Sequence, residues 1–284
     1  MRVPELPEVE ILVRHLNPVL RGRTIREATV HRAKSVRPDT ARRFAVGVSG
    51  TKILQVRRRA KYLLFDLETN SQDSALLLGH LGMTGRMYVQ PARATLPKHA
   101  AVSLRLNRGV FVFEDTRYFG RMTLDTSALE KLGPEPLSDQ FNGRVLHEGL
   151  RKCSQPIKTK LLDQSLLAGV GNIYASESLW RAGISPRKLS RRLSAPQCDL
   201  LAHWIRAVLC EAVEAGSTVP LDFLGRGEGD GLFYYGSAPD AVGREENLNV
   251  YDREGKTCRR CSGLIRRIVQ SNRSTFYCAR CQRG

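Results

Sequence analysis

The residues best placed by type and spacing to do chemistry are four cysteines near the end of the chain. Cys258 and Cys261 form one Cys-x-x-Cys pair, and Cys278 and Cys281 form a second pair sixteen residues later. This spacing is typical of four thiolates bound to one tetrahedral Zn²⁺. Because residues 251–284 bury too little apolar surface to fold unaided, we expect one structural Zn²⁺ to supply the folding energy. Two disulfides are the alternative, which the paired spacing disfavours.

The segment around these cysteines is strongly basic. Between Lys256 and Gly284 the chain has eight Lys or Arg residues and no Asp or Glu. Over the whole chain 45 Lys and Arg outnumber 28 Asp and Glu, which gives a formal net charge of +17. Such an excess favours a phosphate backbone as the partner, although a solvated basic surface would give the same composition.

The length and composition bound the class of protein. A chain of 284 residues with 42% hydrophobic content can bury a core and predicts two domains. No stretch approaches eighteen consecutive apolar residues, so no membrane span is expected. The first residues are acidic, unlike a signal peptide. The remaining cysteines are expected to be free thiols in a reducing cytoplasm: Cys153, Cys198 and Cys210.

Hydrophobic periodicity predicts that, after an initial helix, the first half of the chain is mainly β structure and the second half mainly helical. A helix is expected over residues 7–20, and short β segments that form a sandwich or barrel follow up to residue 124. The predicted strands cover residues 24–30, 52–58, 62–67, 75–81, 102–106 and 110–113. After the boundary at 133–136 (GPEP), helices are expected over 142–152, 157–164, 173–182 and 196–215.

Two glycine-containing segments attract attention in the second half. The turn at 169–172 (GVGN) precedes a predicted helix, and its consecutive backbone N–H groups could cradle a phosphate, although glycine also serves helix packing. Residues 225–247 are glycine-rich and charged, which is consistent with either a mobile lid or a plain linker.

The start of the first helix combines prolines with carboxylates. Acidic residues and proline both favour the first turn of a helix, which accounts for Pro7, Glu8 and Glu10. This structural explanation does not account for Pro4.

Seven motifs are spread over the chain in a fixed order. They are PELPEVE at 4–10, RAKYL at 59–63, HLGMTG at 80–85, DTRYFG at 115–120, LGPEPL at 132–137, GVGNIYASE at 169–177 and the four-cysteine segment. The chain therefore resembles the formamidopyrimidine-DNA glycosylases over nearly its whole length. Each motif alone could arise by chance, but the ordered set is highly specific.

The resemblance implies an α+β fold. An N-terminal helix and a β-sandwich would form a catalytic domain over 4–132, and a helix–two-turns–helix DNA-binding domain would follow over 137–224. A mobile lesion-capping loop would cover 225–250, and the zinc finger would cover 251–284.

The resemblance also implies an activity. Members of the family are base-excision repair glycosylases with AP lyase activity, which remove 8-oxoguanine and formamidopyrimidines and then nick the strand by β,δ-elimination. The implied partner is damaged double-stranded DNA, bound by a monomer in the bacterial cytoplasm at the nucleoid. No cofactor besides the one Zn²⁺ is expected.

Four catalytic residues are implied by matching positions. The family's nucleophile is an N-terminal proline, which matches Pro4, and a free secondary amine can attack the sugar C1′ to form a Schiff base. Glu5 matches the acid that protonates the sugar ring oxygen. Lys61 matches the lysine that supports both steps, and Arg273 matches the residue assigned to the second elimination.

The surroundings of Lys61 are consistent with that role. Arg57, Arg58 and Arg59 lie close by in sequence, and nearby positive charges lower the pKa of a lysine. On a strand, residues 57, 59 and 61 would share one face. A solvated basic strand edge is the ordinary alternative.

The resemblance assigns DNA contacts as well. Met83, Arg117 and Phe119 match a wedge that fills the space left by an extruded base, where apolar chains replace lost stacking and the guanidinium binds the orphaned base. For Met and Phe, packing in the core is the alternative. The implied phosphate contacts are His99, Lys152, Lys158, Asn172 and Arg273.

The sequence departs from the family pattern at its start. Residues 1–3 precede Pro4, whereas the family's proline directly follows the initiator Met. A proline nitrogen inside a peptide bond is not nucleophilic, so we expect translation to begin at Val3 and its initiator Met to be removed. Smaller departures lie at 100–101, at 151–155 and in a longer 225–247 loop, which bear on the lesion range.

Two alternatives remain from the sequence. The related endonuclease VIII branch prefers oxidised pyrimidines, although Leu6-Pro7 and the motif at 80–85 favour the purine branch. A non-catalytic DNA-binding zinc protein is the second alternative, and it applies if the nitrogen of Pro4 is never exposed.

Overall fold

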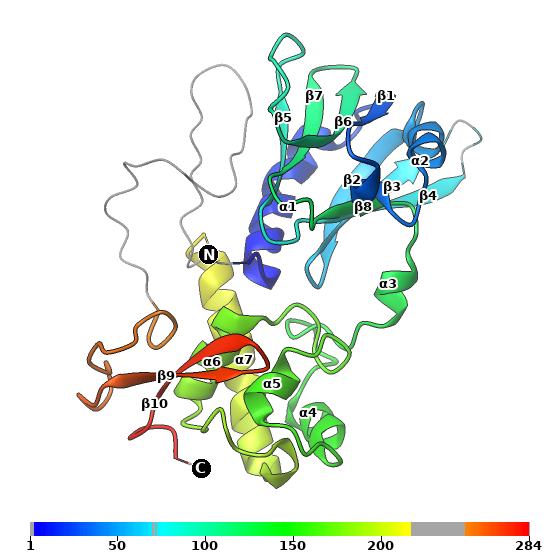
Figure 1. Ribbon diagram of the computed structural model, residues 1–284. Helices are drawn as coiled ribbons and strands as arrows, with labels where there is room; N and C mark the ends of the chain where they lie inside the picture. The colour runs from blue at the N-terminus through cyan, green and yellow to red at the C-terminus, as the bar shows by residue number, and fades with distance from the viewer. Residues whose placement is uncertain (1–2, 70, 72, 217–247, 284) are drawn as a thin grey trace. The chain divides into compact units, whose positions relative to one another are not determined.

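The computed structural model describes residues 3–69, 71, 73–216 and 248–283, which fall into two compact units (Figure 1). The first unit contains the described residues up to 130, and the second contains 131–216 with 248–283. The predicted capping loop at 225–250 lies almost entirely outside the described residues.

The first unit is a β-sandwich with a helix at its start. Helix α1 (Leu6–Leu20) precedes two four-stranded antiparallel sheets (Figure 1). One sheet has the order β1 (Ile25–Val30), β6 (Ala100–Leu106), β7 (Val110–Asp115), β5 (Gly85–Gln90). The other has the order β2 (Lys52–Arg59), β3 (Tyr62–Glu68), β4 (Ser74–His80), β8 (Arg121–Thr123). The predicted helix and sandwich are confirmed.

The core of this unit lies between the sheets and α1. The apolar face of α1 is fully buried, as the helical spacing predicts: Val9, Leu12, Val13, Leu16 and Leu20. These side chains join Phe44, Phe65, Phe111 and Phe113 in one cluster. Each such side chain contributes about 1.5–3 kcal/mol when it leaves water. A hydrogen bond also holds α1 to β2, because Asn17 Oδ1 accepts the Val56 N–H at 2.8 Å.

Short helices complete the first unit. They are η1 (Ala33–Val36), α2 (Ala41–Val48) and α3 (Ser127–Glu130). Thr40 caps α2 by accepting the Arg43 N–H at 3.1 Å, and Phe44 anchors it in the core. Neither these helices nor strands β5 and β8 were predicted from the sequence.

The second unit is helical and ends in a β-hairpin. It contains α4 (Gly143–Leu150), α5 (Ile157–Leu161), α6 (Asn172–Arg181), η2 (Ser190–Arg192), α7 (Ala195–Glu214), β9 (Ile265–Gln270) and β10 (Arg273–Cys278). Helices α4 and α6 both pack against α7, and β10 packs against α6. Ser194 and Gln197 form a capping box at the start of α7. The four predicted helices are confirmed.

The finger has a small core of its own. Trp180 of α6 packs with Val250, Ile265, Phe276 and the cysteines Cys258 and Cys278. No helix among the described residues is both long and apolar enough to cross a membrane.

Candidate zinc, catalytic and nucleic-acid sites

The four paired cysteines come together in the finger. Their Sγ atoms all lie within 4.8 Å of one another, with 3.8 Å from Cys258 to Cys281 and 3.4 Å from Cys261 to Cys278. Sulfur atoms bound to a tetrahedral Zn²⁺ at about 2.3 Å lie about 3.8 Å apart, so the quartet fits that ion. All seven cysteines are free of disulfides. Burial raises the pKa of the Cys258 thiol, but the Arg260 N–H at 3.4 Å helps lower it to about 6, which favours the thiolate.

A buried carboxylate fastens the finger to α6. Glu177 is 2% exposed, and its oxygens accept the backbone N–H groups of Asn249, Val250 and Tyr251 at 2.8–2.9 Å. The Asn249 side-chain amide donates a further bond at 3.0 Å. Nothing in the sequence marks Glu177 for this role, because a glutamate on a helix usually faces solvent.

Three of the predicted DNA-contact residues lie together beside the finger. Lys158 on α5 is fully buried, and its Nζ donates to Asn172 Oδ1 at the start of α6. Both side chains also reach the Ser274 carbonyl, at 3.5 Å from Lys158 Nζ and 2.9 Å from Asn172 Nδ2. Ser274 directly follows Arg273, whose side chain is exposed.

The hairpin turn explains how Arg273 is presented. Ser271 and Asn272 both have positive φ, 48° and 58°, and Gln270 pairs with Arg273 across the hairpin. Consecutive positive φ values match the right-handed twist of the strands in a two-residue hairpin. A buried ammonium and the start of α6 therefore lie beside the hairpin strand that carries Arg273, a combination that suits an anion such as phosphate.

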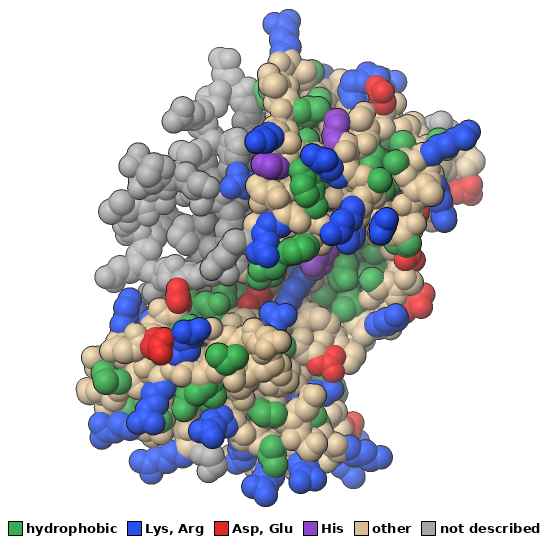
Figure 2. All heavy atoms as spheres, in the orientation of Figure 1, with side chains coloured by type: hydrophobic (Ala, Val, Ile, Leu, Met, Phe, Trp, Pro, Cys, Tyr) green, Lys and Arg blue, Asp and Glu red, His purple; other side chains and the backbone are tan. Residues whose placement is uncertain are grey.

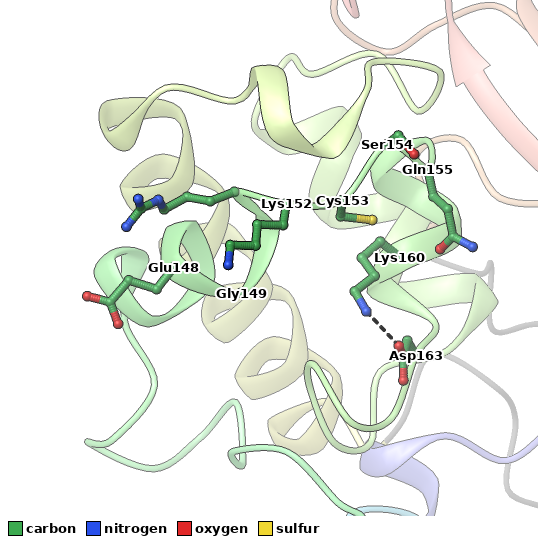
Figure 3. Close-up of a pocket in the computed structure, with 9 residues that line it drawn as sticks. Glu148, Gly149, Lys152, Cys153, Ser154, Gln155, Lys160 and Asp163 are labelled. Carbon is green, nitrogen blue, oxygen red and sulfur yellow. Dashed lines mark hydrogen bonds and ion pairs between the residues drawn. The ribbon is translucent and has the colours of Figure 1, made fainter.

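Lys152 lies in a different part of the second unit. It lines an open pocket of about 760 Å³ together with Cys153, Lys160 and Asp163 (Figure 3). Figure 3 shows Lys160 paired with Asp163, at 2.7 Å, which lowers the pKa of that carboxyl to about 2. Asp163 therefore neutralises the charge of Lys160, whereas the charge of Lys152 adds to the basic surface.

The predicted nucleophile and acid lie directly ahead of α1. Pro4 and Glu5 are both buried, and Glu5 is 2% exposed. Glu8 in the first turn fixes this segment, because its Oε2 accepts the Glu5 N–H at 2.8 Å. The prolines and acids at the helix start therefore position Glu5 as well as favour the helix.

Lys61 lies in a tight turn between β2 and β3. Arg59 pairs with Tyr62, so Ala60 and Lys61 form a two-residue hairpin turn in which Ala60 has φ +53°. The expectation that residues 57, 59 and 61 share one strand face is wrong, because β2 ends at Arg59. Lys61 lies instead in the turn at the end of the hairpin, where it is half-buried.

Carboxylates neutralise two of the neighbouring arginines. Arg58 Nε lies 2.8 Å from Glu10 of α1, and Arg57 Nε lies 2.8 Å from Asp66 of β3. The bond to Asp66 is the largest influence on the pKa of Arg57 and raises it. The expected crowding of like charges around Lys61 is therefore weaker than the sequence suggests.

His80 also belongs to this region. It pairs with Tyr62 across β3 and β4, and its ring centroid lies 4.9 Å from that of Tyr62. Burial, and then the charges of Lys61 and Arg121, lower the pKa of His80 to about 4. The Gly82 N–H donates to Nδ1 at 3.1 Å, so the neutral ring carries its proton on Nε2. His80 belongs to the HLGMTG motif, but nothing in the sequence indicates this environment.

The three wedge residues lie on two neighbouring loops of the first unit. Met83 is in the turn between β4 and β5, and Arg117 and Phe119 follow β7. Phe119 is 46% exposed, and the Arg117 guanidinium lies 4.8 Å from its ring centroid. An exposed aromatic ring does not belong to a core, which favours the binding role over packing. His99 is nearby, with Nδ1 3.2 Å from the Tyr118 hydroxyl.

Comparison with known proteins accounts for these features together. The sequence profile of the formamidopyrimidine-DNA glycosylase N-terminal domain matches residues 3–122, and that of its H2TH domain matches 132–221. A zinc finger found in FPG and IleRS matches 255–284. Formamidopyrimidine-DNA glycosylase of Ruegeria pomeroyi is 40% identical, over 99% of this chain and all of the relative.

The chain belongs to the formamidopyrimidine-DNA glycosylase family. Solved structures of similar proteins contain DNA. A Lactococcus lactis FPG mutant in complex with Fapy-dG DNA has a TM-score of 0.85 and 31% identity, and covers 99% of this chain and all of the other. MutM in complex with carbocyclic 8-oxo-G DNA has a TM-score of 0.84 and 31% identity with the same coverage.

Membership in this glycosylase family fixes the broad function. The protein is a DNA-binding repair glycosylase whose four-cysteine finger holds one structural zinc ion. The first unit contains Pro4 and Glu5 directly ahead of α1, Lys61 in the β2–β3 turn, and the two loops that carry the wedge residues. Within the second unit the structure brings Lys158, Asn172 and the Arg273 hairpin together.

Proposed function

We propose that the protein excises oxidised purines, namely 8-oxoguanine and formamidopyrimidines, from duplex DNA and then nicks the strand at the abasic site. The observation that carries this substrate class is the full-length likeness to FPG bound to Fapy-dG DNA, supported by the MutM complex with an 8-oxo-G analogue. Identity of 40% to Ruegeria pomeroyi formamidopyrimidine-DNA glycosylase over the whole of that enzyme supports it further.

The proposed chemistry begins at Pro4. Its secondary amine attacks C1′ of the damaged nucleotide, and the C1′–N bond to the base breaks. Glu5 protonates the sugar ring oxygen as the ring opens, and an iminium ion forms between C1′ and Pro4. The iminium acidifies C2′, so loss of the C2′ proton expels the 3′ phosphate, and a second elimination expels the 5′ phosphate.

Other residues are proposed to bind and position the DNA. Lys61, in the tight turn between β2 and β3, supports base loss and elimination, and Arg273 supports the second elimination. Lys158 and Asn172 would hold a phosphate of the damaged strand, with His99 and Lys152 as further backbone contacts. Met83, Arg117 and Phe119 would fill the gap in the helix after the base leaves it.

Borohydride trapping tests this mechanism directly. Borohydride reduces the iminium to a stable amine, so the protein should form a covalent adduct with a duplex that contains 8-oxoguanine. We expect Lys61→Ala to reduce adduct formation at least about a hundredfold, while binding to an uncleavable abasic analogue changes little. A form that retains residues 1–3 should give no adduct, because the Pro4 nitrogen is then part of an amide.

The outcomes separate the alternatives. Adduct on dihydrouracil duplex in preference to 8-oxoguanine would favour a pyrimidine-directed enzyme. Tight binding to damaged duplex with no adduct on either substrate would favour a non-catalytic DNA-binding protein. An adduct formed equally by protein whose Pro4 is acylated would rule out Pro4 as the nucleophile.

A further inference from the structure

A fully buried carboxylate lies at the end of β7, between the two loops that carry the wedge residues. Asp115 is 0% exposed and belongs to the DTRYFG motif. Its Oδ1 accepts the Thr84 hydroxyl and the Arg117 N–H, the latter at 3.1 Å. Its Oδ2 accepts the Gly120 N–H at 2.7 Å. One side chain therefore binds three donors from two separate loops.

The donors are adjacent in sequence to all three wedge residues. Thr84 directly follows Met83 in the turn between β4 and β5. The N–H groups of Arg117 and Gly120 belong to the loop after β7 and enclose Phe119. In addition, the backbone N–H of Asp115 donates to the His99 carbonyl at 3.0 Å. Asp115 is thus the common partner of the segments that present Met83, Arg117, Phe119 and His99.

The two loops also touch through their backbones. A Cβ atom on Gly82 would lie 2.5 Å from the Gly120 nitrogen and 2.7 Å from the Phe119 carbonyl carbon, so only glycine permits this approach. Tyr118 has φ +53°, a conformation that is unfavourable for a residue with a bulky side chain. Backbone in such a conformation persists only when its surroundings hold it, and the carboxylate provides bonds on both sides of Tyr118.

The charge of the side chain matters to this arrangement. A carboxylate has four lone-pair sites and no donor, so it can accept all three bonds at once, and bonds to an ionised acceptor are stronger than neutral ones. An amide of the same shape has one acceptor atom, and its NH₂ group would face an N–H or a hydroxyl. Asp115→Asn therefore leaves at least one of the two backbone N–H groups without its acceptor while the volume is unchanged.

We propose that Asp115 is the positioning residue of the wedge: its carboxylate locks the two loops together so that Met83, Arg117 and Phe119 enter the duplex as one rigid unit. This inference rests on the proposed function of those three residues. It assigns Asp115 no contact with DNA and no part in proton transfer. Its role is to have the wedge preorganised before the base is extruded.

A matched control exists in the same unit. Asp39 is 5% exposed, and its Oδ2 accepts the Thr123 hydroxyl and the Leu124 N–H, both at 2.7 Å. Like Asp115, it is a buried carboxylate that accepts a threonine hydroxyl and a backbone N–H, and Arg43 Nε lies 3.5 Å from its other oxygen, but its partners lie outside the wedge loops. Asp39→Asn therefore removes a buried negative charge of the same kind away from the wedge.

The test compares these variants on duplex and single-stranded DNA that contain the same abasic site. A wedge is needed only where an opposite strand must be held apart, so borohydride trapping on the single strand should stay within about threefold of the unsubstituted protein for both variants. On the duplex we expect Asp115→Asn to react about 10–100-fold more slowly and Asp39→Asn within about threefold. A fluorescent 2-aminopurine opposite an uncleavable abasic analogue should brighten on binding by Asp39→Asn, and by Asp115→Asn less than half as much.

Every outcome decides the matter. The inference would be overturned if both variants lost the same trapping rate on duplex, if Asp115→Asn lost as much on the single strand as on the duplex, or if neither variant lost any rate. The proposed function would stand in each of these cases. No adduct from the unsubstituted protein would overturn the proposed function and this inference together. If Asp115→Asn does not fold, Thr84→Val removes one of the three bonds, and a duplex-specific loss of about threefold or more is then required.

Discussion

Among single residues, the half-buried His80 responds to the charges around the site. His80 is neutral at pH 7, and its pKa lies near 4 because burial and the charges of Lys61 and Arg121 oppose protonation. In the unfolded chain its pKa is about 6.5. Between these values the unfolded state binds a proton that the folded state does not. The contribution of His80 to stability is therefore complete above pH 6.5 and is lost as the pH falls toward 4.

This difference leads to a prediction for His80→Asn. The Asn Oδ1 can still accept the Gly82 N–H, but the side chain no longer titrates. The free energy of unfolding of the unsubstituted protein should fall, relative to that of the variant, by on the order of 2–3 kcal/mol from pH 7 to pH 4. Urea unfolding across this range measures it. Parallel pH profiles for the two proteins would contradict the prediction.

The cysteine quartet could be predicted from the sequence because its residue type and spacing carry the chemistry. Pro4 and Arg273, by contrast, were assigned only through the resemblance to the family, and their roles remain predictions. The motifs at 115–120 and 169–177 contain Asp115 and Glu177 but do not reveal their roles, because each carboxylate accepts a bond from a donor far away in sequence. Thr84 is 31 residues from Asp115, and Asn249 is 72 residues from Glu177. No local pattern reveals such distant partners.

At the scale of elements, α1 and the β2–β3 hairpin are joined beside Lys61. Glu10 of α1 binds Arg58 at 2.8 Å, and Arg58 Nη1 donates to the Ala60 carbonyl at 3.1 Å, one residue before Lys61. The side chains of Arg58 and Glu10 are 9% and 21% exposed, so water screens this pair only partly. Burial raises the pKa of Glu10, but Arg58 and Arg14 outweigh it, and the pKa is lowered overall.

Glu10→Gln should therefore disturb the turn that presents Lys61. We expect a loss of about 1–3 kcal/mol in stability and an about tenfold slower borohydride-trapping rate on abasic duplex, with DNA affinity within about twofold. Asp66→Asn is the matched control, because it removes the acidic partner of Arg57 on the same hairpin but away from α1. A trapping rate that falls equally in both variants would show that the pair with Glu10 has no special role.

The finger gives a second prediction at this scale. Trp180 of α6 is 6% exposed in the small core that the zinc site organises, and the chain has only two tryptophans. Removing Zn²⁺ with a chelator, or Cys258→Ser, should shift the tryptophan fluorescence to longer wavelength and weaken DNA binding at least about tenfold. The helical circular dichroism should remain, since α4, α6 and α7 pack together without the metal.

Cysteine outside the quartet supplies the control for that experiment. Cys210→Ser on α7 should retain zinc, the fluorescence maximum and DNA affinity. Retention of tight DNA binding by fully metal-free protein would contradict the assignment of the finger as a zinc-dependent DNA-binding element.

Elements were predictable where the periodicity was long. Helices α1 and α7 have 15 and 20 residues, and their apolar faces are plain in the sequence. By contrast, β8 has only 3 residues, too few for a period to be recognised. The position of Lys61 was missed for another reason: a two-residue turn with Ala at positive φ lacks the usual glycine or asparagine signal.

At the scale of the whole molecule, the net charge of +17 is distributed over both units. Figure 2 shows Lys and Arg side chains over the viewed face of each unit, with far fewer Asp and Glu. Many of these charges are ordinary surface charges that pair with acids, as Arg144 does with Glu148 at 3.0 Å. Arginines that neutralise DNA phosphates differ from them in one measurable way, because each releases a condensed counterion on binding.

The salt dependence of binding therefore separates the two kinds of arginine. For a duplex with an uncleavable abasic analogue, log affinity should fall linearly with log salt concentration, and Arg273→Ala should reduce the magnitude of the slope by about 1. Arg144→Ala, which removes an equal charge from α4 where the side chain is 87% exposed, should leave the slope unchanged even if the affinity falls slightly through the general field. Fluorescence anisotropy between about 50 and 300 mM salt measures both slopes. If the two variants changed the slope equally, the basic surface would act only as a diffuse field, and the Arg273 hairpin would have no specific phosphate to bind.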